Sequence, residues 1–239
     1  MIDKMIVKLR RYDKLDPEEE AALLGAVTEI KKFARGTVLV RRQTPTRACE
    51  VVVSGLVHRY RDLSDGRRQS MELSIPGDFV DLHSFTMKEI DHDIACLTQC
   101  QVAIVPHDRL EQITTQFPHL GRVLWLSTMI DAAIHREWIV SLGARSAVQR
   151  LAHLFCEMAV RLESVGLADA DGYRFPITQN ALSELLGMSM VHVNRTVKEL
   201  RERELVVFRE QQVRIQSWEG LVRLADFDPF YLGMHRRPR

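Results

Sequence analysis

Residues 189–200 place hydrogen-bonding side chains on one side of a predicted helix. Ser189 can cap this helix, because its hydroxyl can accept a hydrogen bond from an amide of the first turn. At about 100° of rotation per residue, Asn194, Arg195 and Lys198 fall on the same side. The opposite side carries the apolar residues Val193, Val197 and Leu200. The stretch therefore predicts a helix with one packed side and one basic, hydrogen-bonding side.

A second short helix is predicted just before this one. Thr178 can cap it, and Gly187 suits the left-handed residue that ends a helix. Its apolar residues are Ala181, Leu182, Leu185 and Leu186. Because Ser189 follows Gly187 by only two residues, the two helices must cross steeply and share a small core. The spacing of Ser183, Gly187 and Val193 indicates a helix-turn-helix.

A helix with a basic outer side and a free N-terminus has the form that the major groove of duplex DNA admits. Asn194 and Arg195, with His192, are expected to contact base edges, while other residues hold phosphates. The residues expected at this surface are Thr178, Gln179, Asn180, Ser189, Met190, Val191, His192, Asn194, Arg195 and Lys198. The runs LVVFR and QVRI that follow predict a β-hairpin, a wing beside the helix. An ordinary helical hairpin with a solvated charged side is the alternative.

Composition limits the classes of protein to which the chain can belong. It has 239 residues, 46% hydrophobic and 27% charged, which predicts a globular protein of one large or two modest domains. The 33 basic and 32 acidic residues nearly balance, so DNA affinity must come from a local patch. Four separated cysteines favour reduced thiols. The chain shows neither a signal peptide nor a membrane span, and we expect a cytoplasmic protein.

The elements before the helix-turn-helix fall into three groups. Asp16 and Pro17 predict a helix start within a helical first 35 residues, with the helix continuing from Ala21 to Phe33. Short apolar runs separated by turn residues then predict an antiparallel barrel or roll, with strands at 37–40, 50–60, 69–75, 94–97 and 101–105. A long helix is expected from Pro118 to about Ser141.

The long helix is apolar on more than one face. Leu124, Trp125, Met129 and Ile139 lie apart from its main stripe, so the helix must be covered twice. A second copy of the chain is the economical cover, and the predicted dimer contacts are Val123, Leu126, Ile130, Ile134 and Trp138. Burial of the helix within one subunit is the alternative. Leu142-Gly143-Ala144 is predicted to be a flexible joint to the next domain.

These motifs together resemble the Crp/Fnr family of bacterial transcription regulators. The resemblance covers nearly the whole chain, and TQNALSELLGMSMVHVNRTVKEL is its most specific part. It implies an α+β protein: an N-terminal cyclic-nucleotide-binding-type antiparallel β-roll at 1–117, a dimerisation helix at 118–142 and a winged helix-turn-helix DNA-binding domain at 143–239. It also implies a homodimer that binds a two-fold symmetric DNA site and acts on RNA polymerase. Two reading helices would then lie about 34 Å apart. The C-terminal HRRPR is expected to be an untethered tail.

Two regions depart from the family pattern. Where relatives carry Arg-Glu or Val-Glu on the reading helix, this chain has Met190 and Val191, which can only pack against an apolar group such as a thymine methyl. In the roll, the family's Gly-Glu pair is replaced by Asp81-Leu82, and no arginine occurs between Arg68 and Arg109 to meet a cyclic phosphate. We therefore expect no standard cyclic AMP binding. Any effector pocket is placed at Asp81, Leu82 and His83.

No cofactor is predicted, and the effector stays unidentified. No cysteine precedes Cys49, which disfavours an iron-sulfur cluster, while oxidation of Cys96 and Cys100 or haem ligation by His83, His92 or His107 stays open. A metal-dependent β-roll enzyme is the rival reading, but His58, His83, His92 and His107 lack the HxH spacing of such sites. A ligand-binding dimer that no longer binds DNA is the third. A regulator without enzymatic activity is the preferred prediction.

Overall fold

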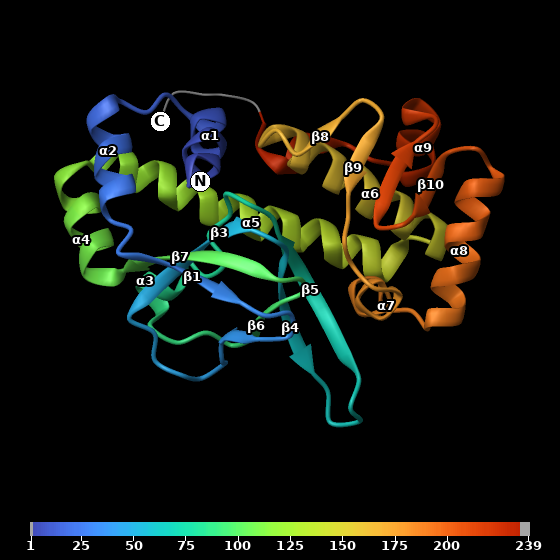
Figure 1. The fold of residues 1–239 in the computed structure, drawn as a ribbon, viewed down its shortest axis with the longest axis horizontal. Helices are drawn as coiled ribbons and strands as arrows, with labels where there is room; N and C mark the ends of the chain where they lie inside the picture. Colours follow the sequence, from blue (N-terminus) through green and yellow to red (C-terminus); the bar gives the residue numbers. More distant parts are fainter. Residues whose placement is uncertain (1, 235–239) are drawn as a thin grey trace. The chain divides into compact units, whose positions relative to one another are not determined.

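The computed structural model describes residues 2–234, and Figure 1 shows their helices and strands. The chain divides into two compact units. Of the described residues, the first unit holds 2–61, 72–133 and 233–234, and the second holds 62–71 and 134–232. The C-terminal HRRPR lies outside the described residues. Within residues 2–234, no helix combines the length and apolar character that crossing a membrane requires.

Two helices open the first unit, α1 (Asp3–Tyr12) and α2 (Pro17–Gly25). Asp16 starts α2 as predicted and forms a capping box with Glu19, whose Oε2 accepts the Asp16 backbone N–H at 3.0 Å. The predicted continuation of this helix to Phe33 is wrong, because strand β1 (Glu29–Phe33) follows. β1 pairs antiparallel with β7 (Cys100–Pro106), so a partner far along the chain, and not local helix propensity, decides its conformation.

Two antiparallel sheets form the β-roll. One has the order β1-β7-β3, and the other has the order β2-β6-β4-β5. The remaining strands are β2 (Val38–Val40), β3 (Ala48–Ser54), β4 (Val57–Asp62), β5 (Arg68–Ser74) and β6 (Asp93–Cys96). Gly55 makes the tight turn from β3 to β4: its φ is 91°, and a Cβ there would lie 2.5 Å from the Gln99 carbonyl oxygen. Apolar side chains from both sheets fill the interior, including Val52, Val57, Ile94 and Val102.

Three helices lie in the sequence between the roll strands and the helix-turn-helix: α3 (Ser84–Met87), α4 (His107–Gln116) and α5 (Pro118–Ala144). α4 is not predicted by the sequence. The long helix α5 begins at Pro118 as predicted, but it continues through Leu142-Gly143-Ala144, where a joint was expected. Arg150 donates hydrogen bonds to the carbonyl oxygens of Ser141 and Leu142, which stabilises this last turn. The chain leaves the helix at Arg145 and Ser146.

The second unit contains α6 (Ala147–Ser164), α7 (Gln179–Leu186), α8 (Met190–Glu202) and α9 (Trp218–Ala225), with a 3-10 turn η1 (Pro229–Leu232). Its sheet has the order β10-β11-β9-β8, formed by β8 (Ala168–Asp169), β9 (Gly172–Arg174), β10 (Val206–Arg209) and β11 (Gln212–Ile215). The predicted wing hairpin is β10-β11, closed by the pair Arg209 and Gln212. The predicted α+β class, a β-roll followed by a long helix and a winged helix-turn-helix, is confirmed.

Candidate nucleic-acid interface

Helices α7 and α8 form a helix-turn-helix through the local features that the sequence predicts. Thr178 caps α7, with its hydroxyl accepting the Ala181 N–H at 3.2 Å. Gly187 ends α7 in the left-handed conformation, with φ at 62°. Ser189 caps α8 by accepting the His192 N–H at 3.3 Å. Each polar cap satisfies a backbone group that the helix itself leaves free, so the turn is set by its own residues.

The two sides of α8 differ as the spacing predicts. Val193 and Leu200 are buried against the rest of the unit, and Val197 is half-buried. Thr196 is also buried; its hydroxyl donates to the His192 carbonyl oxygen at 2.9 Å, and this packing residue was not predicted. The core of the helix-turn-helix is completed by residues of α7: Ala181, Leu182, Leu185 and Leu186.

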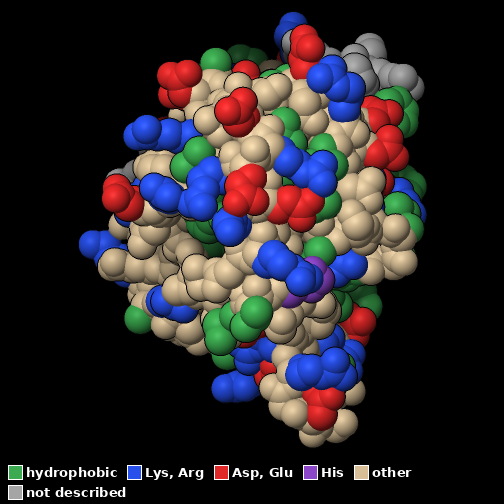
Figure 2. Space-filling model, turned by 90° about the vertical axis from the view of Figure 1, so that its right-hand side faces the viewer, with side chains coloured by type: hydrophobic (Ala, Val, Ile, Leu, Met, Phe, Trp, Pro, Cys, Tyr) green, Lys and Arg blue, Asp and Glu red, His purple; other side chains and the backbone are tan. Residues whose placement is uncertain are grey.

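The outer side of α8 is accessible over most of its length. Asn194, Arg195 and Lys198 are exposed, His192 is half-buried, and Met190 and Val191 have exposed fractions of 51% and 81%. Figure 2 shows Lys and Arg side chains in several groups on the side of the molecule where α8 lies in Figure 1, with Asp and Glu side chains between them.

The two basic residues of this side differ in their surroundings. Within residues 2–234, the side chain of Arg195 makes no hydrogen bond or ion pair, so its guanidinium is free to meet a ligand. Nζ of Lys198 lies 3.4 Å from Oε1 of Glu202. This exposed ion pair is weak, so Lys198 can leave Glu202 and bind another anion. Gln179 and Asn180 are exposed at the start of α7, where Asn180 donates to Glu184 at 2.8 Å.

Arg150 of α6 is a residue of this region that the sequence did not single out. Its guanidinium donates to the Leu186 carbonyl oxygen at the end of α7 and to the Leu142 carbonyl oxygen at the end of α5, at 2.5 and 3.0 Å. Burial lowers the pKa of Arg150. One side chain therefore joins the last turn of the long helix to the turn of the helix-turn-helix. The sequence around Arg150 does not indicate that Leu142 and Leu186 are its partners, because Leu186 lies far from it along the chain.

The stripe of α5 predicted to meet a second copy lies on the side that packs within the chain. Val123, Ile130, Ile134 and Trp138 have exposed fractions of 0 to 7%, and Leu126 is half-buried. The assignment of these four residues to a partner contact is wrong, because the protomer itself covers them. The apolar residues left exposed on α5 are Trp125 (68%), Met129 (48%), Ile139 (69%) and Val140 (48%). The helix does carry two apolar faces, of which one is buried within the chain and the other is exposed.

Asp81, Leu82 and His83, predicted for an effector pocket, lie just before α3. Asp81 is buried; its carboxylate accepts the Glu50 N–H at 2.7 Å and the Ser84 hydroxyl at 3.2 Å. Burial raises the pKa of Asp81 to about 6. Leu82 is buried, and Nε2 of the half-buried His83 has no hydrogen-bond partner among the described residues. The contacts of Asp81 tie strand β3 to the start of α3.

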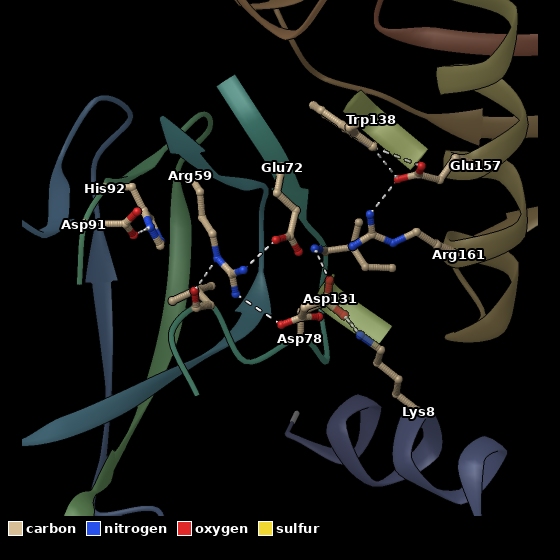
Figure 3. A network of polar contacts seen from close by, with 12 residues as sticks. Lys8, Arg59, Glu72, Asp78, Asp91, His92, Asp131, Trp138, Glu157 and Arg161 are labelled. Carbon is tan, nitrogen blue, oxygen red and sulfur yellow. Dashed lines mark hydrogen bonds and ion pairs between the residues drawn. The ribbon is translucent and has the colours of Figure 1, made fainter. Parts of the chain in front are cut away.

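A buried cation that the sequence did not reveal lies in the roll. Arg59 of β4 is 2% exposed and donates to Glu72 at 2.6 Å and to Asp131 of α5 at 3.2 Å (Figure 3). Burial lowers the pKa of Arg59, the two carboxylates raise it, and the carboxylates prevail. Lys8 pairs with Asp78 in the same unit. Lys8 and Arg59, the buried lysine and arginine of the first unit within residues 2–234, are thus both paired with carboxylates.

The cysteines and histidines considered for sensing pack in the core of the roll or contact neighbouring polar side chains. Cys96 and Cys100 are buried in the apolar core of the roll. His92 lies 2.8 Å from Asp91, and His107 lies 3.3 Å from the Ser84 hydroxyl. The part of the chain that the structure describes holds no group of three or more His, Cys, Asp or Glu side chains arranged to bind a metal.

Known proteins share both halves of this arrangement. A family model described as a cyclic nucleotide-binding domain matches residues 30–117, and one described as a Crp-like helix-turn-helix domain matches residues 149–224. The chain is 25% identical to the transcriptional activator protein FnrL of Cereibacter sphaeroides over 77% of this chain and 74% of that protein. It is 27% identical to the nitrogen fixation regulation protein FixK of Bradyrhizobium diazoefficiens over 70% of each.

The fold has a close counterpart in a solved structure. FixK2 from Bradyrhizobium japonicum has a TM-score of 0.75 at 24% identity, over 83% of this chain and 97% of that chain. The two family models match in the expected order and together cover more than half of the sequence. With the exposed reading helix and the relatives named as transcriptional regulators, these matches show that the chain belongs to the Crp/Fnr family of DNA-binding transcription regulators.

Proposed function

We propose that this regulator is a homodimer that reads a two-fold symmetric duplex site, with α8 of each protomer in a major groove. The observation that carries the proposal is the division of α8 into a buried and an open side. Val193 and Leu200 are almost fully buried, whereas Asn194 and Arg195 are exposed and need no change of fold to reach a base edge. The N-terminal end of α8, which Ser189 caps, carries the positive end of the helix dipole, which would favour a phosphate of the same duplex.

Arg195 and Lys198 are assigned different roles. Arg195 has no partner to leave, so its planar guanidinium can make the bidentate contact with guanine that contributes roughly 1–3 kcal/mol of base discrimination. Asn194 can do the same with adenine. Lys198, with Thr178, Gln179 and Ser189, is assigned to phosphates, which position the protein without reading sequence. A dimer makes each of these contacts twice, which raises the preference for the specific site over random DNA.

The dimer contact is assigned to the exposed face of α5. Trp125, Met129, Ile139 and Val140 are separated in turn by 4, 10 and 1 residues, which at about 100° of rotation per residue places them on one side of a single helix, with Arg136 between them. An exposed stripe of this kind suits pairing with the same helix of a second copy. In this proposal residues 1–117 are the sensor, 118–142 the dimerisation helix and 143–239 the DNA-binding domain, and RNA polymerase is the further partner.

We assign no cyclic AMP binding of the usual kind and no enzymatic activity to the roll. A buried cyclic phosphate needs a countercharge, because its desolvation is costly. Arg59 already serves Glu72 and Asp131, and Asp81 adds a further buried carboxyl group. Titration calorimetry with cyclic AMP is expected to give no saturable binding below millimolar concentration. Micromolar binding would overturn this part of the proposal.

The DNA proposal is tested by selecting bound sequences from a random duplex pool. We expect a site with two-fold symmetry. Arg195→Ala should weaken binding to the selected site far more than binding to random DNA, whereas Lys198→Ala should weaken both and flatten the dependence on salt. Lys32→Ala, at an exposed lysine of β1, is the matched control and should change neither. Equal losses for Arg195→Ala in the two assays would contradict its role as a base reader.

A further inference from the structure

We propose that Val191 recognises the methyl group of one thymine in each half-site, so that the chain selects a T·A pair where a polar side chain would select another base. The inference rests on the proposed reading of DNA by α8 and adds a specific base to it. The observation behind it is the position of Val191 in the first turn of that helix, where it is 81% exposed, whereas Val193, two residues later, is buried.

The packing of α8 does not involve the exposed side chain of Val191. The helix core is complete with Val193, Thr196 and Leu200, and the N-terminal end is capped by Ser189. Val191 therefore projects from the same end of α8 as Asn194 and Arg195, which are exposed and polar. A single exposed valine means little by itself. Its place among base-reading groups is what gives it a role.

Major-groove chemistry then limits what Val191 can recognise. Base edges in this groove present acceptors, donors and one apolar group, the C5 methyl of thymine. An isopropyl group offers no hydrogen bond, so it would leave the N4 donor of cytosine or the N6 donor of adenine without water and without a partner. Only thymine gains from the contact. Recognition thus comes both from the methyl contact and from the penalty on the other bases.

Val191 suits this role better than its neighbour Met190. A valine in a helix occupies one side-chain rotamer about 90% of the time, so its two methyl groups have fixed positions before DNA arrives. Met190, 51% exposed, is unbranched and flexible and can adapt to several surfaces. We therefore assign base discrimination to Val191 and looser packing to Met190.

The first test changes only the DNA. In the site selected by the full-length protein, each thymine is replaced in turn by deoxyuridine, which lacks the methyl group and keeps every hydrogen-bonding atom. At one position per half-site, affinity should fall about four-fold, and on the order of fifteen-fold when both half-sites are changed, as expected for one buried methyl group each. Deoxyuridine outside the selected positions is the control and should have no effect.

The second test changes only the protein. Val191→Glu adds an acceptor for the N4 amino group of cytosine, so repeated selection should convert this thymine column to cytosine. Val191→Ala should lose the distinction between thymine and deoxyuridine at this position and keep the other columns. Val7→Ala, at an exposed valine of α1, is the matched control and should leave the column as thymine. Circular dichroism checks that each variant folds.

The outcomes separate this inference from the proposal on which it rests. A selected site that tolerates deoxyuridine everywhere, or that keeps the same columns with Val191→Glu, overturns the thymine assignment and leaves DNA reading by α8 standing. If wild-type protein selects no sequence at all, the proposed function fails and the assignment fails with it.

Discussion

Trp138 near the end of α5 donates its indole N–H to the carboxylate of Glu157 on α6, with Nε1 3.1 Å from Oε2. The same carboxylate is fully buried and also accepts from Arg161 at 2.9 Å and from the Tyr231 hydroxyl at 2.8 Å. Figure 3 shows the contacts of Glu157 with Trp138 and Arg161. Burial raises the pKa of Glu157, and the Arg161 charge opposes this shift. A single acid thus gathers donors from three helical elements of the second unit.

Removing this acid should destabilise the second unit strongly. Glu157→Ala takes a buried carboxylate away from its three donors, Trp138, Arg161 and Tyr231, and we expect a loss of about 3–5 kcal/mol in the free energy of unfolding, measured with urea. The double variant Glu157→Met with Arg161→Met should lose less, because both charges of the buried pair are replaced together by apolar side chains. Glu219→Ala, which breaks an exposed pair with Arg223, is the control and should change stability by less than about 0.5 kcal/mol.

Charges on the exposed face of α5 should prevent dimer formation. Trp125→Glu and Ile139→Glu each place a carboxylate against its own copy across the proposed two-fold axis, and burying such a pair is unfavourable. Analytical ultracentrifugation should show a monomer for either variant and a dimer for the wild type. Met87→Glu, at an exposed apolar residue of α3, should stay dimeric. Dimers that persist with both α5 charges would place the contact elsewhere.

The wing turn should accept a stabilising substitution. Glu210 and Gln211 both have positive φ, 51° and 62°, in a two-residue hairpin turn whose preferred residues are Asn and Gly. Gln211→Gly removes the steric cost of a Cβ in this region and should raise the free energy of unfolding by about 1 kcal/mol. Gln212→Gly lies one residue later in β11 and should lower it by about 0.5–1 kcal/mol. Thermal unfolding of the two variants should therefore shift in opposite directions.

Glu50 should make the first unit less stable as pH rises. Its Oε2 is buried without a partner among the described residues, and burial, followed by the Asp81 charge, raises the pKa of Glu50 from 4.5 to about 8. The folded state therefore holds a proton that the unfolded state releases, so stability is lost as pH increases between about 4.5 and 8. Asp81, with its pKa raised to about 6, acts in the same direction.

A neutral isostere tests this sign. Glu50→Gln should match the wild type near pH 4 and exceed it in free energy of unfolding at pH 8 by on the order of 1 kcal/mol or more. Glu111→Gln, at an exposed glutamate of α4, should leave the pH dependence unchanged. A wild type whose stability rises steadily from pH 5 to 8 relative to Glu50→Gln would contradict the assignment.

Local chemistry made the helix-turn-helix predictable. The caps Thr178 and Ser189, the left-handed Gly187 and the apolar spacing of α8 act within a few residues of one another, and the structure places each as the sequence indicates. β1 could not be predicted in the same way, because its conformation depends on pairing with β7. For the same reason, the spacing along β4 does not show that Arg59 is buried between Glu72 and Asp131.

The two faces of α5 show a second limit of prediction from the sequence. The sequence indicates that both faces must be covered, but it does not say which one meets the protomer's own core. Val123 and Trp125 are both large and apolar, and only the packing of the other elements distinguishes them, leaving one 0% and the other 68% exposed.

The guanidinium of Arg150 satisfies carbonyl groups at the ends of two helices at once, Leu142 of α5 and Leu186 of α7. A rotation of the final turn of α5 would therefore pull directly on the residue that precedes Gly187. If two copies read a two-fold site as proposed, a base pair inserted at the centre of that site would rotate one half-site relative to the other, and a link this short would let α8 of each copy move little to follow it.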